Sequence, residues 1–273
     1  MATKYRFIDT EIGDDGIATL TLDDVGTKNA VNDVMNAEIL DFCNAVEVND
    51  SARVLIVTGA GGAFCSGGNV KQMAASGKSL EAPAESVRQR LYPRSAGIRA
   101  TVLAFRQLSK PTIAAVNGPA VGSGIGLAAG CDLRVAAESA RFHWVFVRRG
   151  IVPDDASLAL VGRLVGYSNA FLWGVTGRSL NAQQARDIGF VQEVVPDERL
   201  MAHCKELARE IIDNCPPITV QLFKLALAED HGRFLGEMVD LTAQAQQVSR
   251  ATEDHTEALR AYIEGRPPGW RAR

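Results

Sequence analysis

The chain has 273 residues, of which 47% are hydrophobic and 22% are charged, and its formal net charge at pH 7 is −3. That length allows one large domain, or one domain with an appendage, that buries a sizeable core. Nucleic acid is not expected as a partner, because phosphate binding favours a basic surface. The five cysteines are odd in number and form no CxxC pair, which indicates free thiols rather than disulfides or a zinc site.

Neither a secretory signal nor a membrane segment is expected. Residues 1–15 contain no apolar segment of the kind found in a secretory signal peptide. The uncharged run 111–131 has the length of a membrane span, but its glycines and Asn117 favour a buried strand, turn and helix. We therefore expect a cytoplasmic protein.

In chain order, the first predicted element is a strand over 17–22. Its apolar residues alternate with period two, which is typical of a half-exposed strand near a sheet edge. Helical spacing of apolar residues predicts a helix over 31–48, with Asn32 or Asp33 as its N-cap. The apolar run 54–57 predicts a buried strand.

The polar segment 74–100 predicts a mobile loop that leads into a helix over 101–108. The other predicted strands span 112–116, 133–136 and 191–195, and the other predicted helices span 123–129, 156–165 and 180–187. Beyond about residue 197 all predicted elements are helical. We therefore expect a core over 1–197 and a C-terminal helical oligomerisation region over 198–273.

Two of these strands run into glycine-rich turns, VTGAGGAFCSGGN at 57–69 and VNGPAVGSGIGLAAGCD at 116–132. The pairs Thr58-Gly59 and Asn117-Gly118 sit at matching points, a weak internal repeat that predicts stacked or coiled α/β units. Glycine lets a ligand approach the backbone closely. Side by side, the two turns would aim backbone N–H groups at one oxyanion.

Other motifs in this part of the chain fail on spacing. Gly124–Ala129 fits the dinucleotide pattern G-x-G-x-x-A, but no acidic residue follows about twenty positions later and the glycines lie inside the predicted helix. Gly77-Lys78-Ser79 lacks the earlier glycine of a phosphate loop, and Ser66 and Ser123 miss the G-x-S-x-G elbow. The four histidines show no metal-ligand spacing, and we expect His143 to be structural.

Residues 63–70, AFCSGGNV, resemble the A-F-C-A-G-x-D-[LI] signature of the crotonase, or enoyl-CoA hydratase/isomerase, superfamily. Residues 117–124, NGPAVGSG, are similar to its N-G-x-A-x-G-G-G motif. Shorter matches extend the resemblance over nearly the whole chain, at 28–30, 140–142, 150–153, 179–182, 189–195 and 253–268. Asn69 stands where the family has aspartate, and Ser123 stands where glycine is usual.

The resemblance implies an α/β fold, a crotonase-like spiral of ββα units with a C-terminal helical trimerisation region, assembled as a homotrimer or a dimer of trimers. It implies an acyl-CoA thioester as substrate, so that coenzyme A belongs to the substrate and no metal or separate cofactor is expected. The thioester oxygen would accept hydrogen bonds from the backbone amides of Gly68 and Ser123. Helix N-termini favour negative charge, which suits the amide of Ser123. Further substrate contacts are implied at Lys28, Ala30, Gly67, Asn69, Val70 and Gly122.

The acid–base residues depart from the family pattern. Gly126 and Phe146 occupy the positions of the two glutamates that share a water in the family's hydratases, and neither can move a proton. Asp154 matches the single aspartate with which some enoyl-CoA and dienoyl-CoA isomerases of the superfamily shuttle a proton. We expect Asp154 to enter a pocket lined by Trp144 and Phe146, while Asp155 caps the following helix.

The resulting hypothesis is a double-bond isomerase in which two backbone amides stabilise a thioester enolate and Asp154 transfers the proton. Gly126 and the segment 74–100 are expected to leave room for a bulky or branched acyl group. A hydratase-like lyase that uses Asp154 alone is one alternative. Another is a hydrolase or dehalogenase in which Asp154, or Asp155 with His143, attacks or activates water. A non-catalytic CoA-binding protein is the third.

Overall fold

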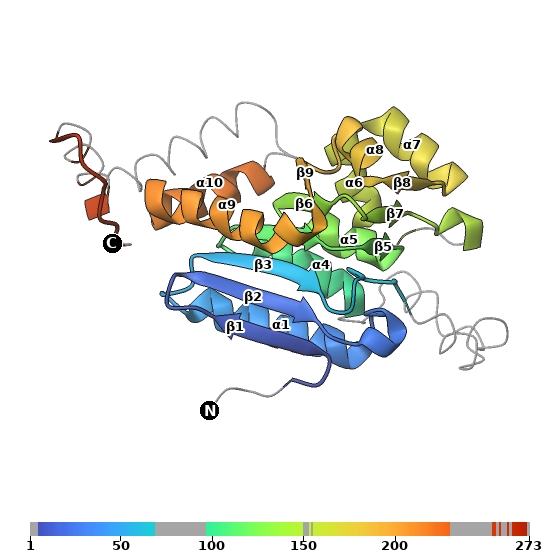
Figure 1. Ribbon diagram of the computed structural model, residues 1–273, viewed down its shortest axis with the longest axis horizontal. Helices are drawn as coiled ribbons and strands as arrows, with labels where there is room; N and C mark the ends of the chain where they lie inside the picture. Colours follow the sequence, from blue (N-terminus) through green and yellow to red (C-terminus); the bar gives the residue numbers. More distant parts are fainter. Residues whose placement is uncertain are drawn as a thin grey trace.

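Figure 1 shows the computed structural model, which describes residues 5–68, 97–149, 153, 155–229, 253–254, 257, 261 and 264–271. The main sheet has six strands in the order β1-β2-β3-β4-β6-β9. They are β1 (Ile8–Ile12), β2 (Ile17–Leu22), β3 (Val54–Gly59), β4 (Thr112–Val116), β6 (Leu133–Ala137) and β9 (Glu193–Val195). β1 and β2 form an antiparallel hairpin, and every later pairing in this sheet is parallel.

A second, smaller sheet has the order β5-β7-β8. Its strands are β5 (Pro119–Val121), β7 (Arg141–His143) and β8 (Ser179–Asn181). β5 follows β4 and leads into the helix α5 (Ser123–Gly130), and β7 follows β6 on the way to α6 (Ser157–Val165). The chain thus repeats a strand–strand–helix unit, which confirms the coiled α/β arrangement expected from the sequence.

The centre of the main sheet is buried on both faces. All six residues of β3 are buried, and their side chains alternate between the faces because a strand has period two. Leu55 and Val57 join the larger apolar cluster, which includes the helix α1 (Asp33–Val48). Val54 and Ile56 join a second cluster with the helix α9 (Leu200–Asn214). Figure 1 shows α1 and α9 on opposite sides of the sheet.

The two covering helices form for clear local reasons. Asn32 caps α1, because its side-chain oxygen accepts a hydrogen bond from the amide of Met35 at 2.9 Å. In α9, Leu200, Cys204 and Ala208 are buried at four-residue spacing and face the sheet. α9 therefore packs on the core, although it lies within the predicted oligomerisation region. The predicted boundary at residue 197 stays a prediction.

The structure confirms some sequence-based expectations and corrects others. β2 lies second from the edge of the main sheet, and its burial alternates as predicted, since Leu20 and Leu22 are buried whereas Thr19 and Thr21 are partly exposed. The predicted helix over 180–187 begins at Ala182, since the preceding residues form β8. Residues 74–96 of the predicted mobile loop lie outside the described residues, and residue 97 already belongs to the helix α4 (Gly97–Gln107).

The remaining helices are α7 (Tyr167–Thr176), α8 (Ala182–Asp187) and α10 (Pro217–Glu229). Every residue of α5 from Gly124 to Gly130 is buried, so this short helix lies in the interior with α4 and α6 against it. None of the helices in the described part of the chain has the length and apolar character needed to cross a membrane.

Candidate active site

Two glycine-rich loops meet where the neighbouring parallel strands β3 and β4 end. The side-chain amide of Asn117 donates to the Gly59 carbonyl at 2.6 Å, and its oxygen accepts from the Gly59 amide at 3.2 Å. Farther along, the Cys65 amide donates to the Pro119 carbonyl at 3.1 Å, and the Val121 amide donates to the Cys65 carbonyl at 2.9 Å. The two loops are therefore bonded backbone to backbone.

Glycine is required where these loops touch. A Cβ on Gly124 would lie 2.5 Å from the carbonyl oxygen of Cys65. Gly67 has a φ of 86°, and a Cβ there would lie 2.6 Å from the carbonyl oxygen of Val121. A side chain at either position would push the loops apart. The glycine clusters in the sequence thus reflect close backbone approach.

The amides of Gly68 and Ser123 lie at this junction. Ser123 is the first residue of α5, and Gly122 turns the chain into the helix with a φ of 52°. The Ser123 nitrogen lies 3.4 Å from the place of a Cβ on Gly67, the residue before Gly68. Within the described residues, neither amide donates a hydrogen bond to the rest of the chain, whereas the Gly122 amide donates to the His143 carbonyl. The structure thus places Ser123 against the residue before Gly68, and the role of these two amides as donors to the thioester oxygen stays a prediction.

The segment Lys28-Asn29-Ala30 supports the first loop. Asn29 is fully buried with a φ of 60°, and its side-chain nitrogen donates to the Ala63 carbonyl at 2.8 Å. The Lys28 carbonyl accepts from the Ser66 amide at 2.9 Å, while the Lys28 side chain is exposed and Ala30 is buried. Lys28 and Ala30 therefore lie beside the loop, and their implied contacts with the substrate stay predictions. Sequence reasoning missed the anchoring role of Asn29, for which the short motif match was the available signal.

The other reactive side chains at the junction are poor candidates for chemistry. Burial raises the pKa of the Cys65 thiol to about 12, so the thiolate nucleophile is scarce at neutral pH. The backbone carbonyl of His143 accepts from the Gly122 amide, and the structural role expected for its side chain stays a prediction. Among the residues that the structure describes, no three His, Cys, Asp or Glu side chains are grouped to hold a metal ion.

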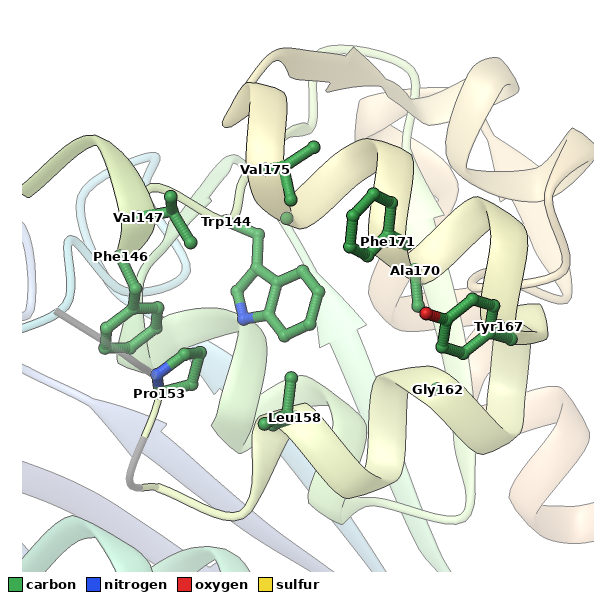
Figure 2. Close-up of a pocket in the computed structure, with 11 residues that line it drawn as sticks. Trp144, Phe146, Val147, Pro153, Leu158, Gly162, Tyr167, Ala170, Phe171 and Val175 are labelled. Atoms are coloured by element: carbon green, nitrogen blue, oxygen red, sulfur yellow. The ribbon is translucent and has the colours of Figure 1, made fainter. Parts of the chain in front are cut away.

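An apolar cavity of about 370 Å³ lies next to Gly122, within the usual size range of small-molecule sites. The ring of Phe146 comes within 3.9 Å of the place of a Cβ on Gly122 and forms one wall of the cavity. Figure 2 shows Trp144 between Phe146 and Pro153 on one side and Phe171 on the other. Trp144 and Phe146, both predicted to bind substrate, therefore line one cavity that borders the junction of the loops.

Gly126 corrects the sequence-based expectation of extra room for the acyl group. A Cβ on Gly126 would lie 2.6 Å from the Asp155 Oδ2 and 3.4 Å from a methyl carbon of Val102. The space beside this glycine is occupied by the buried carboxylate of Asp155, which has no exposed surface. Gly126 therefore accommodates another side chain of the protein rather than widening the cavity.

Asp155 also accepts a hydrogen bond from the amide of Ser157, the first residue of α6, at 3.1 Å. The N-cap position is Ala156, so Asp155 supports the start of the helix from one residue before the cap position. Asp154, Asn69 and Val70 lie outside the described residues, so their predicted roles stay predictions. Pro153, the residue before Asp154, lines the cavity. The predicted base is thus adjacent in sequence to a cavity-lining proline and a buried carboxylate.

A coiled α/β fold in which two glycine-rich loops meet beside an apolar cavity is the arrangement expected of a protein of crotonase type. A model of the enoyl-CoA hydratase/isomerase family matches residues 13–273. The chain therefore belongs to the enoyl-CoA hydratase/isomerase family, within the crotonase superfamily. Its α/β fold matches the crystal structure of an enoyl-CoA hydratase from Bacillus anthracis with a TM-score of 0.89 and 30% identity, covering 98% of this chain and 100% of that one.

Two curated relatives carry other activities in their names. The chain is 32% identical to the 1,2-epoxyphenylacetyl-CoA isomerase of Escherichia coli strain K12, over 93% of this chain and 94% of the relative. It is 30% identical to the 4-chlorobenzoyl coenzyme A dehalogenase-1 of an Arthrobacter species, over 72% of this chain and 69% of the relative. Relatives of similar identity thus include a hydratase, an isomerase and a dehalogenase, which leaves the activity to be argued from the site.

Proposed function

We propose that the protein is an isomerase of unsaturated acyl-CoA thioesters that moves the double bond of an enoyl-CoA or dienoyl-CoA. The observation that carries the proposal is the pair of amides at Gly68 and Ser123 beside the apolar cavity, together with Gly126 and Phe146 at the positions where the family's hydratases have glutamate. Each such donor typically stabilises a developing oxyanion by about 3 kcal/mol. Enolate chemistry is therefore supported, while the two-glutamate route to water addition lacks its residues.

In the proposed mechanism the thioester carbonyl lies between the two amides. The carboxylate of Asp154 removes a proton from the carbon between the carbonyl and the double bond of a 3-enoyl thioester. The bonding electrons shift toward the carbonyl, and the oxyanion of the dienolate is held by the amides of Gly68 and Ser123. The carboxylic acid then returns the proton to the far end of the former double bond. No other reactant is consumed.

The cavity favours an acyl group that carries a ring or a branch. Four of its lining residues are aromatic, namely Trp144, Phe146, Tyr167 and Phe171. Aromatic side chains gain from stacking or edge contacts with a planar group beyond simple burial. The names of the E. coli and Arthrobacter relatives, which contain phenylacetyl and chlorobenzoyl groups, support the same substrate class.

A second candidate is nucleophilic displacement, supported by the Arthrobacter dehalogenase relative. Here an oxygen of Asp154 would bond to the halogen-bearing ring carbon, halide would leave, and water would hydrolyse the resulting aryl ester. Single turnover in ¹⁸O water distinguishes this route, because part of the ¹⁸O would enter the aspartate. A hydratase-like lyase and a non-catalytic thioester-binding protein remain further outcomes of the assays.

The decisive experiment compares wild type with Asp154→Asn on 3-enoyl, 2-enoyl and dienoyl thioesters in deuterated water. We expect deuterium exchange at the α or γ carbon in wild type, and loss of activity with retained thioester binding in the variant. Asp33→Asn makes the same chemical change on the exposed first turn of α1 and serves as the matched control. Unchanged isomerase activity in Asp154→Asn would rule out the proposed base.

We further propose that the protein acts in the cytoplasm as a homotrimer or a dimer of trimers, without nucleic acid, membrane, metal or separate cofactor. Light scattering of the purified protein measures the assembly directly. Metal analysis and activity after chelation test whether the thioester alone suffices.

A further inference from the structure

The carboxylate of Asp155 is buried between α5 and α6, behind the Trp144 wall of the apolar cavity described above. We propose that Asp155 is a positioning residue that holds the indole of Trp144 in that wall, and that Gly126 is glycine because the carboxylate needs its space. The position of Trp144 then decides which acyl groups fit. This last step rests on the proposed function of the cavity, whereas the link between Asp155 and Trp144 does not.

The first part of the argument is the fit between Asp155 and Gly126. Asp155 is fully buried, and a Cβ on Gly126 would lie 2.6 Å from its Oδ2 and 3.0 Å from its Cγ. Since real Cβ atoms do not approach so closely, any larger residue at 126 would displace the carboxylate. The glycine at position 126, where the family's hydratases have glutamate, therefore goes together with the buried aspartate at position 155.

The second part is a continuous hydrogen-bonded connection from Asp155 to the cavity. The Asp155 Oδ1 accepts from the Ser157 amide at 3.1 Å, and the hydroxyl oxygen of Ser157 accepts from the Trp144 indole N–H at 3.0 Å. Ser157 is fully buried, so losing either hydrogen bond would leave a buried polar group without a partner, which costs free energy. Orientation of the indole therefore depends on the turn that the carboxylate fixes.

That turn needs holding, because Ala156 has a φ of 65°, in the left-handed region. An alanine in this conformation is strained and persists only where surrounding contacts impose it. The hydrogen bond from the Ser157 amide to Asp155 spans this residue and stabilises the conformation. Loss of the carboxylate would let the turn relax and shift the Ser157 hydroxyl.

The far edge of the indole is fixed as well. A Cβ on Gly174 of α7 would lie 3.1 Å from the Cζ3 of Trp144, so the ring packs directly on the helix backbone there. Figure 2 shows the indole in the middle of the cavity lining, with Leu158 below it. Because the indole lies in the middle of the lining, a rotation of this ring would change the width of the cavity.

The test uses 5-fluorotryptophan ¹⁹F NMR together with kinetics. The chain has three tryptophans, and the Trp144 signal is assigned with Trp144→Phe. Trp270, whose indole donates to the Asp213 carbonyl, is the internal control. We expect Asp155→Ala to shift or broaden the Trp144 signal and leave that of Trp270 unchanged, while Asp155→Asn, which retains an acceptor for Ser157, behaves nearly as wild type.

In kinetics, Asp155→Ala should raise KM for a ring-bearing thioester about tenfold more than for a straight-chain one, with kcat changed much less. Gly126→Ala should shift the Trp144 signal in the same way, and combining it with Asp155→Ala should add little. Ser157→Ala cuts the connection without touching the carboxylate and should reproduce the effect if the larger changes impair folding.

An unchanged Trp144 signal in both Asp155→Ala and Ser157→Ala would overturn the proposal, as would equal KM changes for the two thioesters. The proposed isomerase activity fails separately, by absence of turnover in wild type. In that case the NMR measurement still decides whether Asp155 positions Trp144.

Discussion

Removal of a single backbone donor provides the most direct test of the oxyanion site. Ser123 is the first residue of α5, and within the described residues its amide donates to no group of the chain. Proline is well tolerated at the first helical position, so we expect Ser123→Pro to change the free energy of unfolding by less than about 1 kcal/mol. The same change deletes one of two donors to the enolate, which predicts a loss of kcat of about 10²–10³-fold, or about 3–4 kcal/mol.

The assay is steady-state isomerisation of a 3-enoyl thioester, with urea unfolding to confirm stability. Because the proline ring also adds carbon atoms, a lactic acid residue incorporated at position 123 gives a cleaner deletion of the N–H. Its matched control is Ser123→Ala, which has the same side chain and keeps the amide. If the lactic acid variant retained kcat within about twofold of Ser123→Ala, the Ser123 amide would not be an oxyanion donor.

Three further predictions concern the scaffold of the site. Gly124→Ala should lower the free energy of unfolding by about 3 kcal/mol, because its Cβ would meet the Cys65 carbonyl. The control Gly162→Ala, whose Cβ would have open space around it, should be neutral or stabilising, and equal effects of the two variants in urea titrations would contradict the close approach of the loops. Asn29→Ala should lower the free energy of unfolding by about 2–4 kcal/mol, since it leaves buried carbonyl groups without a hydrogen-bond donor. A decrease below about 0.5 kcal/mol would argue against the role of Asn29 in holding the first loop. Burial raises the pKa of the Cys131 thiol from 9.0 to about 12, so its contribution to stability is complete below about pH 9 and declines as the pH rises toward 12. Cys131→Ala should therefore show a shallower loss of stability between pH 9 and about 11 than wild type, and parallel curves would refute this.

Much of the fold could be predicted from local sequence. The strands over 54–57 and 112–116 are apolar throughout because both faces of the main sheet are covered, and such runs stand out clearly. β5, β7 and β8 were not predicted, since each has three residues and cannot display a period. These short strands nevertheless carry the chain from the main sheet into the site.

The candidate site was predictable to a similar degree. The two loops follow from their motifs, because close backbone approach forces glycine at fixed points, and the predicted residues Trp144 and Phe146 do line the cavity. The expectation that Gly126 enlarges the cavity was wrong. A glycine has the same letter whether its missing side chain leaves empty space or makes room for a neighbour.

The sequence by itself determined which segments form the two glycine-rich loops and that the two hydratase glutamates are absent, since both depend on residue identity within continuous motifs. Only the tertiary structure decided what fills the place of the missing side chain at 126. Asp155 reaches it from the start of another helix, through a turn held by Ser157 and a left-handed Ala156. That contact joins segments far apart in the chain, and the packing of α5 against α6 alone brings them together.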